Sequence, residues 1–228
     1  MNNKVAVILY GPQGSGKGTQ AKLLSERLNL FHFDTGAYLR SVLFNPKFKN
    51  NKEIQKERKI NEAGILNSPQ WVLKVVSERI SELARLGQAV VLSGSPRTMF
   101  EAFGDSENKG VYPLLEKVYG KKNIYIFNLE IPQSESLKRT SSRVTCSICG
   151  TMLMAQYKSA KKCPFCGGQV EKRADDNKKS IFKRLKEYKE RTLPIFTELK
   201  KRGYKVYKID ATPAPYKIFG KLITYFKK

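Results

Sequence analysis

The 228-residue chain contains one histidine, one tryptophan and four cysteines. It has no apolar run near the roughly 20 residues needed to cross a bilayer. Its first residues lack the small-residue cleavage site of a signal peptide. No internal repeat or low-complexity linker interrupts the chain. We therefore expect a cytoplasmic, globular protein without a membrane partner, and we interpret the single histidine, His32, as structural.

Acidic residues are also scarce. The sequence has 20 Asp and Glu against 43 Lys and Arg, a formal net charge of +23. Such a basic chain attracts polyanions, either nucleotides or nucleic acid. The lysines are interleaved with ordinary helix formers, which favours solvated helix faces for most of them and leaves non-specific nucleic-acid binding open.

Short apolar runs alternate with helical patterns along the chain. The expected buried strands are 5–10, 89–92, 124–127 and 205–209. The expected helices are 36–45, 52–63, 69–86, 133–141, 178–202 and 215–226. This alternation predicts an α/β fold with a parallel sheet. Two segments interrupt it, a lysine-rich one near 34–68 and a cysteine-bearing one near 143–174, and we interpret both as insertions into one core.

A glycine-rich loop joins the first strand to the first helix. Residues 11–17, Gly-Pro-Gln-Gly-Ser-Gly-Lys, fit the pattern G-x-x-x-x-G-K. Glycines let backbone N–H groups turn toward phosphate oxygens, the following helix N-terminus favours anions, and Lys17 adds a positive charge. Gly18 stands where Ser or Thr usually follows the lysine, and Thr19 comes next. A dinucleotide-binding pattern with its downstream acidic partner is absent.

The four cysteines form two closely spaced pairs, Cys146/Cys149 and Cys163/Cys166, each followed by glycine. In a cytoplasmic chain this spacing favours metal over disulfides. Four thiolates hold Zn²⁺ tetrahedrally, and a site with no open position is structural. We therefore predict a zinc ribbon whose metal stabilises a segment too small for a core. Unliganded cysteines and disulfides are the alternatives.

Four segments resemble the adenylate kinase family: residues 11–20, 34–40, 93–98 and 173–177. The resemblance implies a P-loop NTPase-type, five-stranded parallel sheet with helices on both faces. It also implies a core domain (1–33, 69–142 and 175–228), a helical insertion that binds the nucleoside monophosphate (34–68, the acceptor insertion) and a zinc-ribbon lid (143–174, the cysteine insertion). A monomer is expected, because the lid must swing freely.

The resemblance also implies roles for individual residues. Those expected to bind ATP are Gly14, Ser15, Gly16, Lys17, Gly18, Thr19, Arg139 and Arg143. Those expected to bind the acceptor are Thr35, Arg40, Asn67, Gly94, Arg97, Glu101, Arg173 and Arg184. Those expected to act in catalysis are Lys17, Arg97, Arg143, Arg173 and Arg184. Phosphoryl transfer depends on positioning and charge stabilisation, and arginine forks bind phosphate oxygens bidentately.

Three positions depart from the family pattern. Ser93 stands where the family has an Asp that organises the water shell of Mg²⁺, and Ala37 replaces the acid that usually follows Thr-Gly. Asp34 or Asp175/Asp176 are candidates to compensate. Glu101 replaces a Gln that reads the adenine edge. A carboxylate only accepts hydrogen bonds, so it suits guanine better than Gln would.

These patterns predict reversible, in-line phosphoryl transfer from MgATP to AMP, giving two ADP, by an enzyme with structural Zn²⁺. Another acceptor, GMP first, is the alternative within this class. A nucleotide- or RNA-binding protein with little kinase activity is the alternative from another class. The charge, the zinc ribbon and Ser93 favour that last alternative, and the arginine set argues against it.

Overall fold

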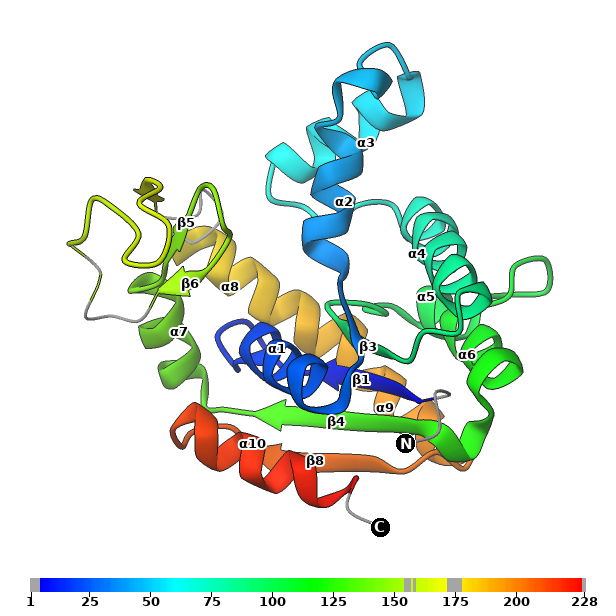
Figure 1. The fold of residues 1–228 in the computed structure, drawn as a ribbon. Coiled ribbons are helices and arrows are strands. Elements are labelled where there is room, and N and C mark those ends of the chain that lie inside the picture. Colours follow the sequence, from blue (N-terminus) through cyan, green and yellow to red (C-terminus); the bar gives the residue numbers. More distant parts are fainter. Residues whose placement is uncertain (1–4, 154–156, 158, 172–177, 227–228) are drawn as a thin grey trace.

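A computed structural model describes residues 5–153, 157, 159–171 and 178–226 (Figure 1). Its centre is a five-stranded sheet in the order β2-β3-β1-β4-β8, and every neighbouring pair is parallel. The strands are β1 (Ala6–Tyr10), β2 (Phe31–Asp34), β3 (Val90–Ser93), β4 (Ile124–Glu130) and β8 (Val206–Asp210). The predicted α/β fold with a five-stranded parallel sheet is confirmed.

Helices cover both faces of the sheet because the central strands are apolar on both sides. In β1, Val7 and Leu9 pack with residues of α1 (Lys17–Leu28) and α10 (Pro215–Thr224). The alternating Ala6 and Ile8 pack on the opposite face. That face is covered by α4 (Pro69–Arg85), α5 (Met99–Phe103), α6 (Val111–Tyr119) and α9 (Leu193–Lys201).

The sheet topology positions the site. In parallel sheets, ligands bind outside the carboxyl ends of the strands, where the strand order reverses. Here β1 lies between β3 and β4, so the loop after β1 opens into that crevice. The loop after β4 leads into α7 (Gln133–Ser141), and the short 3₁₀ turn η2 (Lys121–Asn123) precedes β4 at the other edge.

The acceptor insertion extends away from the sheet (Figure 1). It contains α2 (Thr35–Leu43), the 3₁₀ turn η1 (Pro46–Phe48) and α3 (Lys52–Glu62). Both helices begin at a side-chain cap: Asp34 accepts a hydrogen bond from the backbone N–H of Ala37, and Asn51 accepts one from Ile54. Such caps satisfy donors that the first helical turn leaves unpaired.

The cysteine insertion forms a separate small sheet in the antiparallel order β6-β5-β7. Its strands are β5 (Val144–Cys146), β6 (Met152–Leu153) and β7 (Val170–Glu171). In the described part of this insertion, the buried cluster consists of Val144, Cys146, Leu153 and Cys163. Half of that small core consists of cysteines, so apolar packing alone gives it little stability.

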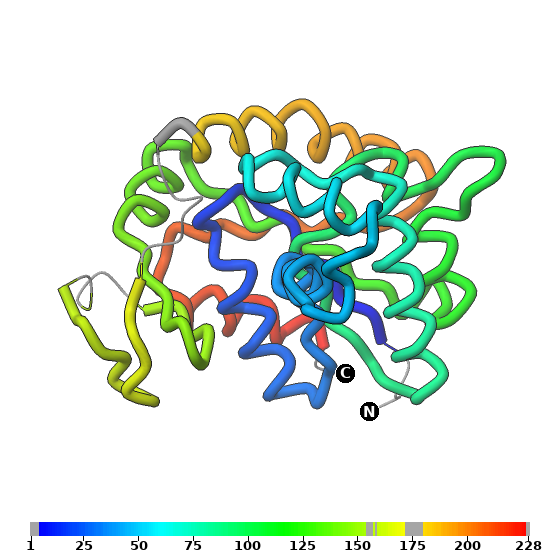
Figure 2. Tube along the Cα trace, turned by 90° about the horizontal axis from the view of Figure 1, so that it is seen from above, coloured from blue at the N-terminus to red at the C-terminus, as the bar shows by residue number. Residues whose placement is uncertain are grey.

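The helix predicted over 178–202 is divided in three. It consists of α8 (Lys178–Glu187), a π-helical turn η4 (Tyr188–Thr192) and α9. Pro194 explains the break, because proline lacks an N–H and its ring clashes with the carbonyl four residues earlier. Figure 2 shows α8 and α9 running along one side of the molecule from the cysteine insertion. None of the helices in the described residues is long and apolar enough to cross a membrane.

Candidate active site

A cleft of about 650 Å³ opens at the carboxyl ends of β1, β2 and β3. It is bounded by the loop after β1, the start of α2, the loop after β3, and α7 and α8. Fifteen of the sixteen nucleotide-binding residues predicted from the sequence line it: Gly14, Ser15, Gly16, Lys17, Gly18, Thr19, Thr35, Arg40, Asn67, Gly94, Arg97, Glu101, Arg139, Arg143 and Arg184. The remaining one, Arg173, lies outside the described residues, as do Asp175 and Asp176.

The phosphate loop is held from behind by α7. The hydroxyl of Ser136 donates a 2.5 Å hydrogen bond to the carbonyl of Gln13. Gly14 has φ +79°, and a Cβ there would lie 3.0 Å from Thr140 Oγ1 and 3.1 Å from the Ser136 carbonyl. Only glycine fits this left-handed position against a neighbouring helix. The loop is therefore preformed around an opening at the N-terminus of α1.

Lys17, the first residue of α1, lies at the mouth of this loop. Its Nζ donates to the carbonyls of Gly11 at 2.6 Å and Pro12 at 2.8 Å. Burial is the main cause that lowers the pKa of Lys17 from 10.5 to about 7; the charges of Arg97 and Arg143 contribute to this shift, and Asp34 opposes it. The site thus brings several positive charges close together, and a bound anion would favour the charged form of Lys17.

Thr35, which begins α2 and lines the cleft, is only 2% exposed. Its hydroxyl has no hydrogen-bond partner among the described residues. A buried polar atom without a partner costs free energy, so this position is suited to a ligand group. Arg40 lies one turn later on α2, and its Nη1 would approach within 3.4 Å of a Cβ at Gly36.

Asn67 lines the cleft, but its side chain is engaged within the acceptor insertion. Its amide donates to the carbonyl of Glu57 at 2.7 Å and to the Glu57 carboxylate at 2.9 Å. Its oxygen accepts from Asn61 Nδ2 at 3.0 Å. Glu57 also accepts from the backbone N–H of Ser68 at 3.0 Å. This network joins α3 to the segment that enters α4.

The loop after β3 presents Arg97 and Glu101. Arg97 Nε donates to the Gly94 carbonyl at 2.5 Å, and its own carbonyl accepts from Thr192 Oγ1 at 3.0 Å. Glu101 Oε2 accepts from Ser95 Oγ and from the Arg97 backbone N–H, both at 2.9 Å. Burial raises the pKa of Glu101, and these hydrogen bonds oppose the shift.

Three arginines reach the cleft from the opposite side. Arg139 on α7 donates to Glu135 at 2.7 Å and to the carbonyls of Ala211 at 2.8 Å and Thr212 at 2.7 Å. These bonds hold its guanidinium plane beside the loop that precedes α10. Arg143 precedes β5, and Arg184 lies on α8. Arg143 is the first residue of the cysteine insertion, and Arg184 lies on the helix that follows it.

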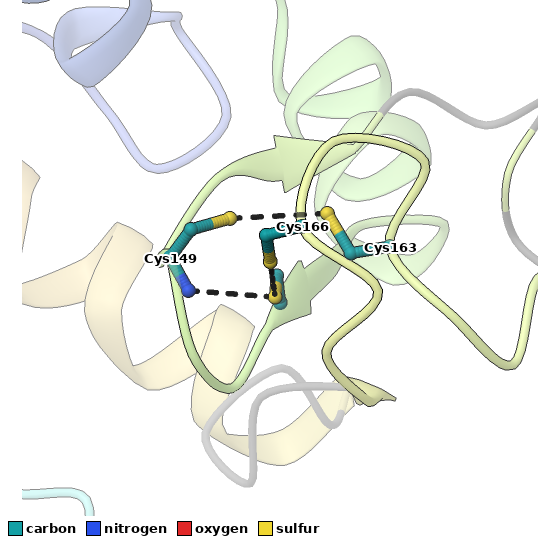
Figure 3. Close-up of side chains that lie close together, drawn as sticks. Cys149, Cys163 and Cys166 are labelled. Carbon is teal, nitrogen blue, oxygen red and sulfur yellow. Dashed lines mark hydrogen bonds between the residues drawn. The ribbon is translucent and has the colours of Figure 1, made fainter.

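The four cysteine sulfurs lie within 4.8 Å of one another. Cys146 Sγ is 3.4 Å from Cys166 Sγ, and Cys149 Sγ is 3.8 Å from Cys163 Sγ (Figure 3). A tetrahedral zinc site with bonds of about 2.3 Å has sulfurs about 3.8 Å apart. The backbone N–H of Cys149 also points at Cys146 Sγ, 3.5 Å away. The group can therefore hold a metal ion.

Ser93, the residue in the position of the family's magnesium-associated Asp, bonds to a neighbouring strand. Its hydroxyl lies 2.9 Å from Nε2 of His32. Burial lowers the pKa of His32, and the charge of Asp34 opposes this. This contact joins the His32 imidazole on β2 to the last residue of β3, which fits the interpretation of His32 as structural.

Some residues that hold the site were not among the site residues predicted from the sequence. Ser136 supports the phosphate loop from α7, and Gln20 on α1 donates to the Pro215 carbonyl at 2.9 Å. Tyr188, in the π-helical turn, donates to Asn128 Oδ1 at 2.8 Å and lines the cleft. Each depends on residues more than 50 positions away. The one local signal was Pro194, which marks the irregular turn.

The fold and the cleft define a phosphate-binding-loop kinase with two insertions, one of which carries a four-cysteine group that could hold a metal ion. The family model described as adenylate kinase matches residues 9–204. The chain belongs to the adenylate kinase family, and it is a phosphotransferase that acts on nucleoside monophosphates.

Relatives named adenylate kinase align over most of both chains. One from Pelobacter propionicus is 36% identical, covering 83% of this chain and 82% of its own. One from Caldicellulosiruptor bescii is 33% identical, with 86% and 87% covered. One from Archaeoglobus fulgidus is 31% identical, with 90% of both chains covered. The resemblance stated from the four motif segments is confirmed over residues 9–204.

Proposed function

We propose that this enzyme catalyses reversible phosphoryl transfer from MgATP to AMP, giving two ADP. The observation that carries the proposal is the single cleft that joins the phosphate loop to Thr35, Arg40 and Arg97. A donor triphosphate at the loop and an acceptor phosphate at the two arginines would face each other in line. Direct transfer then needs no covalent enzyme intermediate.

The residues of the cleft act by positioning and by neutralising charge. Lys17 leaves the carbonyls of Gly11 and Pro12 and pairs with the transferring phosphoryl group. Arg97 and Arg40 clamp the acceptor phosphate. Arg143 and Arg184 approach the phosphates as the cysteine insertion closes, and closure excludes water that would hydrolyse ATP. Arg139 lies against the ATP base, beside Thr212.

Mg²⁺ carried by ATP would neutralise phosphate charge at this site. The acceptor insertion, residues 34–68, and the lid, residues 143–174, are proposed as the two segments that close over the core. Zn²⁺ is the proposed ion at the four thiolates, because its tetrahedral preference matches their spacing. A monomer suits two segments that must both move.

Glu101 bears on the choice between AMP and GMP. A carboxylate that recognised guanine through N1–H and N2–H would need two free oxygens. Oε2 already accepts two hydrogen bonds, whereas Oε1 accepts one long bond of 3.2 Å from Thr98. One oxygen is thus available, enough for the adenine amino group. This arrangement supports AMP, with GMP as the second candidate because Glu101 faces the cleft.

The test is a turnover assay with MgATP against AMP, GMP, CMP and UMP. Wild-type enzyme should turn over AMP with the highest kcat/KM. Lys17→Met should lose activity by about 100-fold or more, the size of effect seen when one preorganised charge-stabilising group is removed. Lys22→Met, an exposed lysine one turn further along α1, is the matched control and should retain activity.

Two results would count against the proposal. Preference for GMP would move the acceptor assignment to the second candidate. Absence of transfer to all four acceptors, in a protein that still binds ATP, would overturn the kinase function itself.

A further inference from the structure

Asp34 and Ser93 end neighbouring strands at the rim of the cleft. They are paired in the parallel register of β2 and β3, and both line the cleft. Paired residues on adjacent strands share a sheet face, and residues two apart on one strand share it too. Val91 packs on the face covered by α1, so Ser93 and Asp34 project to the side from which Lys17 reaches the phosphate loop.

Carboxylates are rare in this cleft. Among the described residues that line it, the acids are Asp34, Glu101 and Glu187. Glu101 is held by donors of its own loop, Ser95, Arg97 and Thr98. Glu187 forms an ion pair with Arg191 at 3.2 Å. The carboxylate that remains for a ligand at the phosphate end is Asp34.

Asp34 has bonding capacity left for such a ligand. Its Oδ1 accepts the cap hydrogen bond from Ala37 at 3.0 Å, and it makes no other hydrogen bond or ion pair with the described residues. Its charge acts on Lys17, whose pKa it raises. Ser93 carries no charge, and its hydroxyl is paired with His32. Position 93 therefore offers no carboxylate, but Asp34, its partner on the adjacent strand, does.

Mg²⁺ keeps several of its waters in proteins and uses one or two carboxylates beside the phosphates of its nucleotide. We infer that Asp34 supplies the carboxylate that orients the water shell of the magnesium ion carried by ATP, from β2 instead of β3. This inference rests on the proposed function, since it assigns a residue to the metal of that same reaction.

The test compares binding of metal-free ATP with binding of MnATP, with Mn²⁺ as the probe and no acceptor present. Asp34→Asn keeps an oxygen for the cap of α2, because Asn caps helices as well as Asp does, and removes only the charge. The variant should bind MnATP about 10- to 100-fold more weakly, the usual cost of losing an outer-sphere partner. It should bind metal-free ATP at least as tightly as wild type, because a negative charge beside the phosphates is gone.

Weaker binding of MnATP without weaker binding of metal-free ATP separates metal positioning from structural damage, because damage would weaken the binding of both. Asp34→Asn combined with Ser93→Asp should restore the preference for MnATP, because it moves the carboxylate back to β3. Ser93→Ala alone should leave that preference unchanged. Asp105→Asn is the charge-matched control, because Asp105 lies in an exposed turn and does not line the cleft.

An Asp34→Asn variant with the wild-type ratio of MnATP to ATP affinity would overturn the inference. A Ser93→Ala variant that no longer prefers MnATP to metal-free ATP would overturn it as well. These outcomes are independent of turnover. A wild-type enzyme that prefers MnATP through Asp34 but transfers phosphate to no acceptor would refute the proposed function alone.

Discussion

The amine of Lys17 donates a 2.6 Å hydrogen bond to the carbonyl of Gly11, inside its own phosphate loop. Together with the bond to Pro12, it holds the side chain at the place where a phosphate would bind. The same burial that positions the amine lowers its pKa to about 7. Binding of ATP must therefore change both its partners and its protonation.

The first prediction concerns protons. Bound phosphates favour the charged amine, so at pH 8 ATP binding should take up a proton at Lys17. Calorimetry in Tris and in HEPES buffer should give enthalpies that differ in proportion to the buffers' ionisation enthalpies, and Lys17→Met should remove most of that difference. Equal wild-type enthalpies in the two buffers would contradict the account.

The lowered pKa of Lys17 should also make the stability of the free enzyme depend on pH. Between about pH 7 and the ordinary value of 10.5, the unfolded chain holds a proton on Lys17 that the folded chain lacks. The free energy of unfolding should therefore rise with pH across this window, relative to Lys17→Met. Below pH 7 the penalty for burying the charged amine is fully present.

The second prediction concerns the support of the phosphate loop. Ser136→Ala removes the 2.5 Å bond to the Gln13 carbonyl and should weaken ATP binding by about fivefold, equivalent to about 1 kcal/mol. Ser141→Ala is the matched control, because that hydroxyl bonds within its own helix, to Lys138. Equal ATP affinities for the two variants would show that α7 does not shape the loop.

The sequence predicted the sheet and the cleft better than the connections between them. Four of the five strands of the large sheet and most helices were predicted to within about three residues, because continuous buried apolar runs such as 6–10 are typical of central strands; β2 (Phe31–Asp34) was not among the predicted strands. The helices α5 (Met99–Phe103) and α6 (Val111–Tyr119) were not predicted. The contact of Ser136 with the phosphate loop spans 123 positions, and no local pattern encodes it.

The third prediction concerns the metal. Purified protein should contain about one zinc per chain. Cys163→Ser removes a buried ligand and should lose that zinc and unfold the cysteine insertion, because its core has few apolar residues of its own. Hydrogen exchange should show lost protection in 144–171 with the five-stranded sheet intact. A metal-free wild-type protein, purified under reducing conditions, would refute the zinc site.

The fourth prediction concerns acceptor choice. Glu101→Gln keeps an oxygen for Ser95 and the Arg97 backbone, and it places an amide donor beside the open position. A donor there suits adenine N1 and opposes guanine N1–H. The ratio of kcat/KM for AMP over GMP should rise by about tenfold, the value of one neutral hydrogen bond near 1.4 kcal/mol. Glu107→Gln, on the exposed turn, should leave the ratio unchanged, and a fall in Glu101→Gln would contradict the assignment.

The most direct test of the central claim is phosphorus NMR of the wild-type enzyme with MgATP and AMP. Transfer between two nucleotides held in one cleft predicts two ADP formed for each ATP consumed, no release of inorganic phosphate, and return of ATP and AMP when the reaction starts from ADP. Conversion of ATP to ADP with an equal amount of inorganic phosphate, or no conversion at all, would contradict it.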